Sequence, residues 1–448
     1  MTNNGEEDRE WGASLTISML QSGDELTSKN GITYKIVKLL GSGGQGEVYE
    51  VITSNGCLYA LKWYHAHMNT KNQKEIIEKL VEDGKPDERF LWPIDQIESS
   101  KTFGYIMDLR PSAYKSIVDL MKRRVEPSFR ELCTAGFNLA DCFQKLHSLG
   151  YSYCDISFGN AFLNAENGEV LICDNDNVIV NGMTNSSVQG TLGFMAPEIV
   201  IGEKGPSAET DLFSLAILLF YMFMLHHPLE GAQEASIKCF DAVAKQRVYG
   251  QNPVFIWHPE DKCNRPISGY QDNAIIYWGI YPKFIKELFI LAFTEGITNP
   301  KRRIVENQWK RAFIQLRDRI IICPICGAET FYQDNSSFGA SNICWNCNKN
   351  IETPPLLKIG NNLIILNRDT VVFEHHLYND FNLSDRVAKV SQHPAYANKW
   401  GLKNVSQKDW LFTKPDGSAV TVKPGKNVPL ICGTQINFGN IEGEIKRN

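Results

Sequence analysis

The pattern of hydrophobic and polar positions predicts a strand-rich region followed by a helix-rich one. From Ile32 to Leu109 the pattern is mostly strand-like, with one helical stretch around Lys71–Val81. From Phe129 to Arg319 the long segments read as helices. These predicted helices are Phe129–Leu149, Asp211–Leu225, Pro282–Phe293 and Gln308–Ile321.

The two ends of the chain follow other patterns. Residues 1–29 form a polar lead-in with one expected strand at Leu15–Met19. Beyond Pro354–Pro355, short β-type runs alternate with turn signals such as Pro415-Asp-Gly, which predicts an all-β sandwich. The expected fold class is therefore α+β. The expected divisions are a lead-in at 1–29, a strand-rich lobe at 30–109, a helix-rich lobe at 110–319, a cysteine-bearing segment at 320–353 and a sandwich at 354–448.

Composition and charge narrow the classes of protein. The 448 residues are 43% hydrophobic and 22% charged, which is ordinary for a globular protein of several domains. A net charge of −5 gives no support to nucleic-acid binding, which usually shows as a basic excess. The first thirty residues are polar and acidic, so no signal peptide is expected. The longest apolar run, Phe213–Leu225, is too short to span a bilayer, so no membrane association is expected.

The twelve cysteines indicate a metal site and not a disulfide framework. Eight are scattered singly, which together with two close pairs fits a reducing, cytoplasmic environment. Seventeen residues separate Cys323-Pro-Ile-Cys326 from Cys344-Trp-Asn-Cys347, a spacing typical of a zinc ribbon. Four thiolates would hold a structural Zn²⁺ and stabilise a segment too short for its own core. A redox dithiol is the alternative, although it needs only one pair.

A glycine-rich segment in the strand-rich lobe predicts a phosphate-binding loop. Gly41, Gly43 and Gly46 have the GxGxxG spacing, and such glycines let the backbone close over phosphates. The same spacing opens dinucleotide-binding folds, but there a helix follows. Here two strand-like runs follow, and the second carries Lys62 sixteen residues after Gly46. A lone lysine on a strand is otherwise a solvated edge residue.

Acidic and amide side chains form a second group in the helix-rich lobe. Tyr153-Cys-Asp-Ile-Ser-Phe-Gly-Asn160 places an asparagine five residues after Asp155, and Asp174 follows a hairpin expected between Leu163 and Val170. Carboxylate and amide oxygens suit a hard cation. Asp and Asn are also common turn formers. Turn formation does not account for the ordered series of glycine loop, lysine, Asp-x4-Asn and aspartate.

This series resembles the protein-kinase family from about Tyr34 to Ile314. Gly190-Thr-Leu-Gly-Phe-Met-Ala-Pro-Glu198 is similar to the end of a kinase activation segment, where Glu198 would pair with Arg303. Asp211-Leu-Phe-Ser214 is similar to the start of the buried helix whose aspartate braces the catalytic loop. The resemblance implies a bilobal fold with ATP and Mg²⁺ as cofactors, and phosphorylation of serine or threonine on a protein substrate.

The resemblance also implies a role for each matching residue. Asp155 would accept or orient the proton of the substrate hydroxyl, with Thr191 bonded near it. Asn160 and Asp174 would bind Mg²⁺, and Lys62 would contact the α- and β-phosphates. The implied nucleotide-binding set is Leu40, Gly41, Gly43, Gly44, Gln45, Gly46, Val48, Ala60, Lys62, Asp108 and Arg110.

Several residues depart from the family pattern. Tyr153-Cys154 replaces the usual His-Arg before the catalytic aspartate, so activity is expected not to need phosphorylation of the activation segment. Ser157 replaces a lysine near the γ-phosphate, which predicts a low turnover, and Asn175-Asp176 replaces Phe-Gly. Candidate autophosphorylation sites, by location only, are Thr184, Ser186, Ser187 and Thr191.

The glutamate that usually pairs with the kinase lysine has no obvious counterpart. The apolar face of the helix around Lys71–Val81 selects Gln73, while Glu75 and Glu78 fall on more polar faces. Either Gln73 substitutes for the glutamate, or the helix is rotated so that another residue faces the lysine.

Other segments resemble narrower groups. A bacterial branch found in tellurium-resistance-type clusters is similar in four segments, namely Gly43–Tyr49, Phe90–Pro93, Tyr153–Asn160 and His226–Gly231. The resemblance implies a metal-dependent protein phosphatase and a von Willebrand A-domain protein as partners. Val428–Gly439 resembles the closing strands of a forkhead-associated domain, which implies phosphothreonine binding through Arg368 and Ser384. A plain docking sandwich is the alternative.

Two functions remain open at this point. The first is an active kinase that phosphorylates serine or threonine, with Asp155 as the catalytic base. The second is a pseudokinase scaffold that binds ATP and organises partners. Lys62, Asp155, Asn160 and Asp174 favour the first, whereas Cys154, Ser157 and Gln73 leave room for the second.

Overall fold

The protein, seen in a computed structural model, forms two compact units, Met1–Pro111 and Ser112–Asn448. The structure describes residues 19–182, 190–333 and 342–446. The strand expected at Leu15–Met19 lies outside these ranges except for Met19, and so do Thr184, Ser186 and Ser187.

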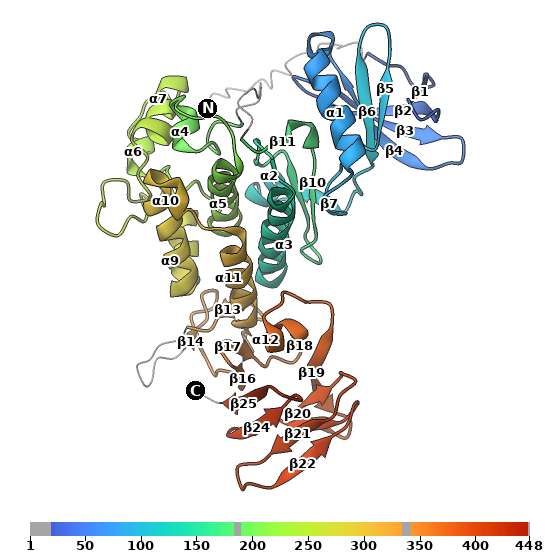
Figure 1. The fold of residues 1–448 in the computed structure, drawn as a ribbon. Helices are drawn as coiled ribbons and strands as arrows, with labels where there is room; N and C mark the ends of the chain where they lie inside the picture. The colour runs from blue at the N-terminus through green and yellow to red at the C-terminus, as the bar shows by residue number, and fades with distance from the viewer. Residues whose placement is uncertain (1–18, 183–189, 334–341, 447–448) are drawn as a thin grey trace, which may run out of the picture. The chain divides into compact units, whose positions relative to one another are not determined.

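The first unit is a six-stranded antiparallel sheet in the order β1-β2-β3-β4-β6-β5, with helix α1 (Lys71–Asp83) lying over it (Figure 1). Thr70 caps the start of α1 by accepting a hydrogen bond from the backbone N–H of Gln73, and Gly84 ends the helix with a φ of +73°. The indole of Trp92 donates to the carbonyl of Leu80 at 2.7 Å and so ties the helix to the following segment. The strands are β1 (Glu25–Thr27), β2 (Thr33–Ser42), β3 (Gly46–Thr53), β4 (Leu58–Tyr64), β5 (Asp95–Glu98) and β6 (Phe103–Asp108).

The second unit begins with a helical region in which α5 (Ala208–Met224) is buried along most of its length. Ser207 and Thr210 cap its start reciprocally, so the helix begins three residues before the expected Asp211. The other helices are α2 (Ile117–Met121), α3 (Phe129–Ser148), α4 (Pro197–Val200), α6 (Ala232–Ala235), α7 (Ala242–Gln246), α8 (Asp272–Ile280), α9 (Lys283–Ala292), α10 (Glu295–Thr298) and α11 (Glu306–Asp318).

The described part of the helical region also contains five short strands that flank its loops. They form a sheet in the order β10-β9-β7 and a pair β11-β8, and β9 and β10 make the hairpin expected between Leu163 and Val170. Their bounds are β7 (Tyr114–Ser116), β8 (Tyr151–Ser152), β9 (Ala161–Asn164), β10 (Val170–Ile172) and β11 (Ile179–Val180).

The last predicted helix is shorter than expected. A helix was expected to reach Ile321, but α11 ends at Asp318 and Ile320–Ile322 forms strand β12. These three β-branched residues pair with β13 (Glu329–Phe331), and isoleucine fits a pleated strand better than a helix interior. A second hairpin joins β14 (Asn342–Ile343) to β15 (Asn350–Ile351).

Two antiparallel sheets make up the C-terminal region and share one hydrophobic core, which includes Leu357, Val372, Trp410 and Ile445. This β-rich arrangement is compatible with the expected sandwich. One sheet contains β16 (Leu356–Ile359), β17 (Asn362–Ile365), β21 (Trp410–Thr413), β22 (Ala419–Val422), β24 (Thr434–Asn437) and β25 (Glu442–Lys446). The other contains β18 (Val371–Phe373), β19 (Arg386–His393), β20 (Tyr396–Asn404) and β23 (Asn427–Pro429), with the short helix α12 (Glu374–Tyr378) after β18.

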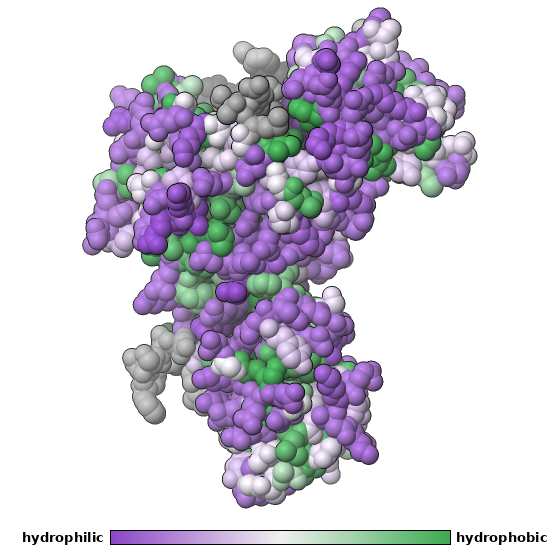
Figure 2. Space-filling model, viewed as in Figure 1, coloured by the Kyte–Doolittle hydropathy of each residue, from purple (hydrophilic) through white to green (hydrophobic). Residues whose placement is uncertain are grey.

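Figure 2 shows mainly hydrophilic residues on the face in view. Among the described residues, no helix is long and apolar enough to cross a membrane.

Candidate active site

The glycine-rich segment is the turn between β2 and β3. The backbone N–H of Gly43 donates to the carbonyl of Gly46 at 2.9 Å, which closes the turn. Gly46 packs directly on β4, where a Cβ atom would lie 2.3 Å from the carbonyl oxygen of Trp63. Gly41 and Gly44 face open space, so only Gly46 is required by close packing within the hairpin.

Lys62 lies on β4 opposite Val48 and is buried, with 4% of its surface exposed. Its ammonium group donates to Oε1 of Gln45 at 2.9 Å. The predicted lysine therefore lies beside the predicted glycine loop, and the edge-residue alternative for Lys62 is wrong. Among the other predicted nucleotide-binding residues, Ala60 is buried on β4, Leu40 and Arg110 are exposed, and Asp108 forms an ion pair with Lys85 at 3.6 Å.

The inward face of α1 carries Gln73. Its side chain is 8% exposed, and its amide nitrogen lies 3.5 Å from the hydroxyl of Tyr64. Glu75 and Glu78 point outward to ion pairs with Lys71 and Lys29 respectively. The structure thus gives α1 the orientation that the apolar pattern selects, with an uncharged amide where the family usually has a carboxylate.

In the second unit, Asp155 is held by two neighbours. Thr191 donates its hydroxyl to Oδ1 of Asp155 at 2.7 Å. The amide nitrogen of Asn160 donates to the other carboxylate oxygen at 3.0 Å and to the backbone carbonyl of Asp155 at 2.9 Å. Because Nδ2 faces Asp155, the Oδ1 atom of Asn160 is left as a ligand atom for a cation.

Asp174 follows the β9–β10 hairpin, as the sequence predicts. Its backbone is left-handed, with φ 50° and ψ 43°, and it begins a short 3-10 helix at Asn175–Asn177. Asn160 and this segment are joined by the backbone N–H of Cys173, which donates to the carbonyl of Asn160 at 3.0 Å. The two predicted Mg²⁺ ligands therefore come from segments that are hydrogen-bonded to each other.

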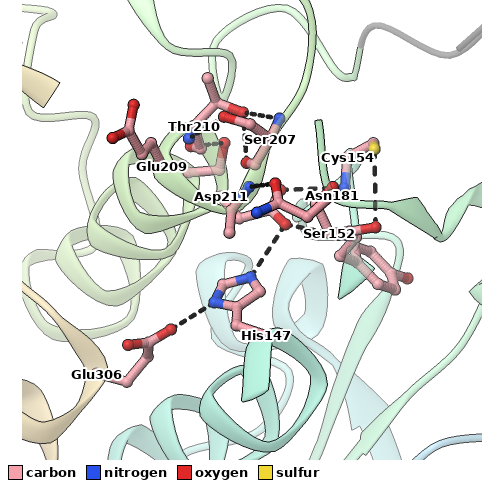
Figure 3. Close-up of polar contacts among 12 residues, drawn as sticks. His147, Ser152, Cys154, Asn181, Ser207, Glu209, Thr210, Asp211 and Glu306 are labelled. Carbon is pink, nitrogen blue, oxygen red and sulfur yellow. Dashed lines mark hydrogen bonds and ion pairs between the residues drawn. The ribbon is translucent and has the colours of Figure 1, made fainter. Parts of the chain in front are cut away.

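The loop that carries Asp155 is held by Asp211 from α5 (Figure 3). Its carboxylate accepts hydrogen bonds from the backbone N–H groups of Tyr153 at 2.6 Å and Cys154 at 3.0 Å. Cys154 has a φ of +70°, a conformation that a non-glycine residue adopts only when its surroundings hold it there. Burial raises the pKa of the Cys154 thiol, so this cysteine is a neutral packing residue and not a nucleophile.

His147 completes this network and was not predicted from the sequence. Its Nε2 lies 3.1 Å from Asp211, and its Nδ1 lies 2.5 Å from Glu306 at the start of α11 (Figure 3). Burial alone would lower the pKa of His147, but the hydrogen bonds and charges of the two carboxylates raise it to about 9. The imidazolium therefore donates to both carboxylates at neutral pH.

Glu198 and Arg303 form the predicted ion pair. A guanidinium nitrogen of Arg303 donates to Glu198 at 2.8 Å, and the side chains are 1% and 11% exposed respectively. Arg303 also donates to the carbonyls of Glu209 and Gly296. These bonds tie the activation-segment end to α5 and α10, and breaking a buried pair of this kind typically costs about 3–5 kcal/mol.

The four paired cysteines lie together. Their sulfur atoms are all within 4.8 Å of one another, with Cys323 3.8 Å from Cys347 and Cys326 3.6 Å from Cys344. Sulfurs placed tetrahedrally at about 2.3 Å from one Zn²⁺ ion are about 3.8 Å apart, so this group fits zinc. None of the four forms a disulfide in the structure.

Arg368 and Ser384 are not brought together. Arg368 precedes β18 and stacks on Trp400, whereas Ser384 precedes β19. Because β18 and β19 are antiparallel, these two residues lie at opposite ends of the strand pair. The arrangement gives no single phosphate site made by both side chains.

Comparison with known proteins agrees with this geometry. A family model described as the protein kinase domain matches residues 34–269, more than half of the chain. The chain belongs to the protein kinase family. The kinase match contains the glycine loop, Lys62, Asp155, Asn160 and Asp174.

Curated relatives described as serine/threonine-protein kinases match part of the chain. The probable serine/threonine-protein kinase CCRP1 of Zea mays is 28% identical over 204 residues, which are 44% of this chain and 32% of that protein. The serine/threonine-protein kinase plk-2 of Caenorhabditis elegans is 28% identical over 209 residues, again 44% of this chain and 32% of the relative. The chain thus spans about a third of the length of these two kinases.

Proposed function

We propose that this kinase transfers the γ-phosphoryl group of MgATP to serine or threonine on a protein substrate. The observation that carries the proposal is the pair of hydrogen bonds on Asp155, from Thr191 and from Asn160. These two bonds restrain the carboxylate, which supports a role in orienting a substrate hydroxyl. Matches to serine/threonine kinases support the same choice of acceptor.

The chain's own residues would divide the work of phosphoryl transfer. Bound MgATP would supply the phosphoryl group and the cation that neutralises its charge. Asn160 and Asp174 would hold the cation through oxygen atoms, while Lys62 and the backbone of the glycine turn would hold the phosphates. Asp155 would orient the hydroxyl and accept its proton.

Activity is proposed not to depend on an arginine-based switch. The residue before Asp155 is Cys154, which is buried and held by Asp211. A neutral thiol cannot pair with a phosphate on the activation segment. Ser157, in place of the usual lysine, is also buried and adds no charge near the γ-phosphate, which supports a low turnover.

The test is transfer of labelled phosphate from ATP to a general protein substrate. Wild type is expected to transfer label, and Asp155→Asn and Asp174→Asn to lose at least about a hundredfold of the rate, since general-base catalysis alone contributes about 10²–10⁴. Arg311→Gln, on an exposed part of α11, serves as the matched control. Transfer of equal amounts of labelled phosphate by the wild type and both aspartate variants would contradict the proposal.

A pseudokinase scaffold is the second candidate, favoured by Gln73 on the inward face of α1 and by the contact between Gln45 and Lys62. An amide cannot form the ion pair that positions the lysine in active kinases. ATP binding without any transfer, unchanged in Asp155→Asn, would select this candidate.

We also propose that the two cysteine hairpins form a zinc ribbon. The resemblance to the bacterial tellurium-resistance branch further supports a metal-dependent phosphatase and a von Willebrand A-domain protein as partners. Co-purification of either protein with the full chain is the direct check.

A further inference from the structure

The C-terminal β region is fixed to the end of α11 by polar contacts. His376 on α12 bonds through Nε2 to Asp318 at 3.1 Å, and the amide of Asn367 donates to the carbonyl of Ile320 at 2.7 Å. Figure 1 shows α11 ending beside β17, β18 and α12. This junction lies inside the second unit and involves none of the residues of the candidate active site.

A cavity of about 160 Å³ lies at this junction and is lined by three arginines. They come from three different elements: Arg130 from α3, Arg317 from α11 and Arg386 from β19. The only carboxylate in the lining is Asp318, which is already bonded to His376. A single water needs only about 10–15 Å³, so the cavity has room for an anion of several atoms.

The three arginines differ in their protein partners. Arg130 forms an ion pair with Asp369 at 3.0 Å. Within the part of the chain that the structure describes, the guanidinium of Arg317 makes no hydrogen bond or ion pair, and it lies over the ring of Phe373 at 5.7 Å. Arg386 is exposed, and its side chain likewise has no hydrogen-bond or ion-pair partner among the described residues. The guanidinium N–H groups of Arg317 and Arg386 are therefore available to donate hydrogen bonds to a ligand.

Arg317 is half-buried and points into this cavity. Burial lowers the pKa of its guanidinium, with only partial compensation from the nearby charge of Asp318. A half-buried cation without a hydrogen-bonded partner loses part of its hydration without compensation, and an anion beside it would restore that loss. A ligand anion in the cavity would remove that cost by accepting from Arg317 and Arg386 together.

We propose that this cavity, which we call the arginine pocket, binds a phosphomonoester group. Guanidinium groups match phosphate oxygens with paired donors, and a phosphomonoester carries close to two negative charges at pH 7. That charge equals the two cations left over in the lining. The pocket goes beyond the proposed kinase activity and does not depend on it, because its residues are separate from those of the active site.

Two sources can supply this chemistry, namely a phosphorylated serine or threonine side chain and a free phosphorylated metabolite.

The test is isothermal titration calorimetry of the full chain without ATP at low salt. The probes are a phosphothreonine peptide, the same peptide without phosphate, and inorganic phosphate. Arg386→Gln is the test variant, because an exposed side chain without partners can be replaced without loss of folding. Arg311→Gln on α11 is the control.

A phosphate-bearing probe is expected to bind to wild type and to Arg311→Gln. Its affinity for Arg386→Gln should be roughly tenfold or more lower, because one charge-assisted hydrogen bond is lost. Binding of the phosphopeptide alone identifies a phosphorylated protein segment, whereas comparable binding of inorganic phosphate identifies a small ligand. Both outcomes support the pocket.

No binding, or binding that is equal in wild type, Arg386→Gln and a folded Arg317→Gln, would overturn the proposal. In the second case the phosphate would be bound elsewhere, for example in the active site.

Discussion

At the scale of single residues, Asp211 and His147 show how buried charges hold the loop that carries Asp155. Asp211 holds the N–H groups of Tyr153 and Cys154, and His147 links that carboxylate to Glu306. Three charged groups that are largely removed from water remain stable because the imidazolium lies between the two carboxylates. Asp155 directly follows Cys154 in the chain, so the position of its backbone depends on this arrangement.

The raised pKa of His147 predicts that stability falls at alkaline pH. Its pKa is about 9 in the folded protein and about 6.5 when unfolded. Because the folded value is the higher one, the stabilisation is complete below about pH 6.5 and is lost as the pH rises through 9, with a magnitude on the order of 3 kcal/mol. The free energy of unfolding, measured by denaturant titration between pH 6 and pH 10, checks this.

The matched variants are His147→Gln and His393→Gln. His393 is exposed at the end of β19, so its replacement should keep the wild-type pH profile. His147→Gln should be less stable at pH 6 and should lose the decline toward pH 9. A His147→Gln profile parallel to that of wild type would contradict the assignment.

At the scale of elements, the β2–β3 hairpin shows which part of a motif is structural. The spacing of Gly41, Gly43 and Gly46 predicts the loop, but only the fold shows that Gly46 lies against the backbone of β4. Similarly, the hydrophobic period predicts the last long helix, yet Ile320–Ile322 pairs as β12 because a partner strand is in place. Helical periodicity cannot show where tertiary pairing overrides it.

Gly46→Ala is therefore expected to damage nucleotide binding more than Gly44→Ala. A Cβ on Gly46 would meet the carbonyl oxygen of Trp63 at 2.3 Å, which forces the hairpin away from β4 and Lys62. Gly44 has open space around it within the protein, so alanine there should leave the hairpin in place against β4. Fluorescent ATP-analogue titration should show binding about five- to a hundredfold weaker for Gly46→Ala, if the typical overpacking cost of about 1–3 kcal/mol is carried into the bound state. Equal affinities in the two variants would show that the hairpin adapts without cost.

At the scale of the whole molecule, the helical region, the cysteine hairpins and the C-terminal β region belong to one compact unit. Phe129 on α3 contacts Phe331 and Trp345 of the cysteine hairpins, and Lys310 on α11 lies over Phe381 of the β region. The cysteine hairpins therefore pack against α3 within this unit. Their folding should affect the stability of the unit as a whole.

Removal of the proposed zinc ion is expected to destabilise this unit. Purified protein should contain about one zinc ion per chain, and Cys326→Ser should lose it because three thiolates bind zinc much more weakly than four. The thermal midpoint should fall by several degrees, in line with a loss of a few kcal/mol. Cys432→Ser, at an exposed single cysteine, is the control. Full zinc content in Cys326→Ser, measured by atomic emission, would contradict a four-cysteine site.

The sequence by itself determined the family and predicted the candidate site, because each motif lies within one short segment whose spacing is local. Asp155 with Asn160, Asp174 after its hairpin, Lys62 and the four cysteines could all be predicted in that way, and their chemical roles remain proposals. Only the tertiary structure decided which distant side chains meet. His147 with Glu306, 159 residues apart, and the arginine pocket depend on how α3, α11 and the β region pack, and no local pattern encodes that packing.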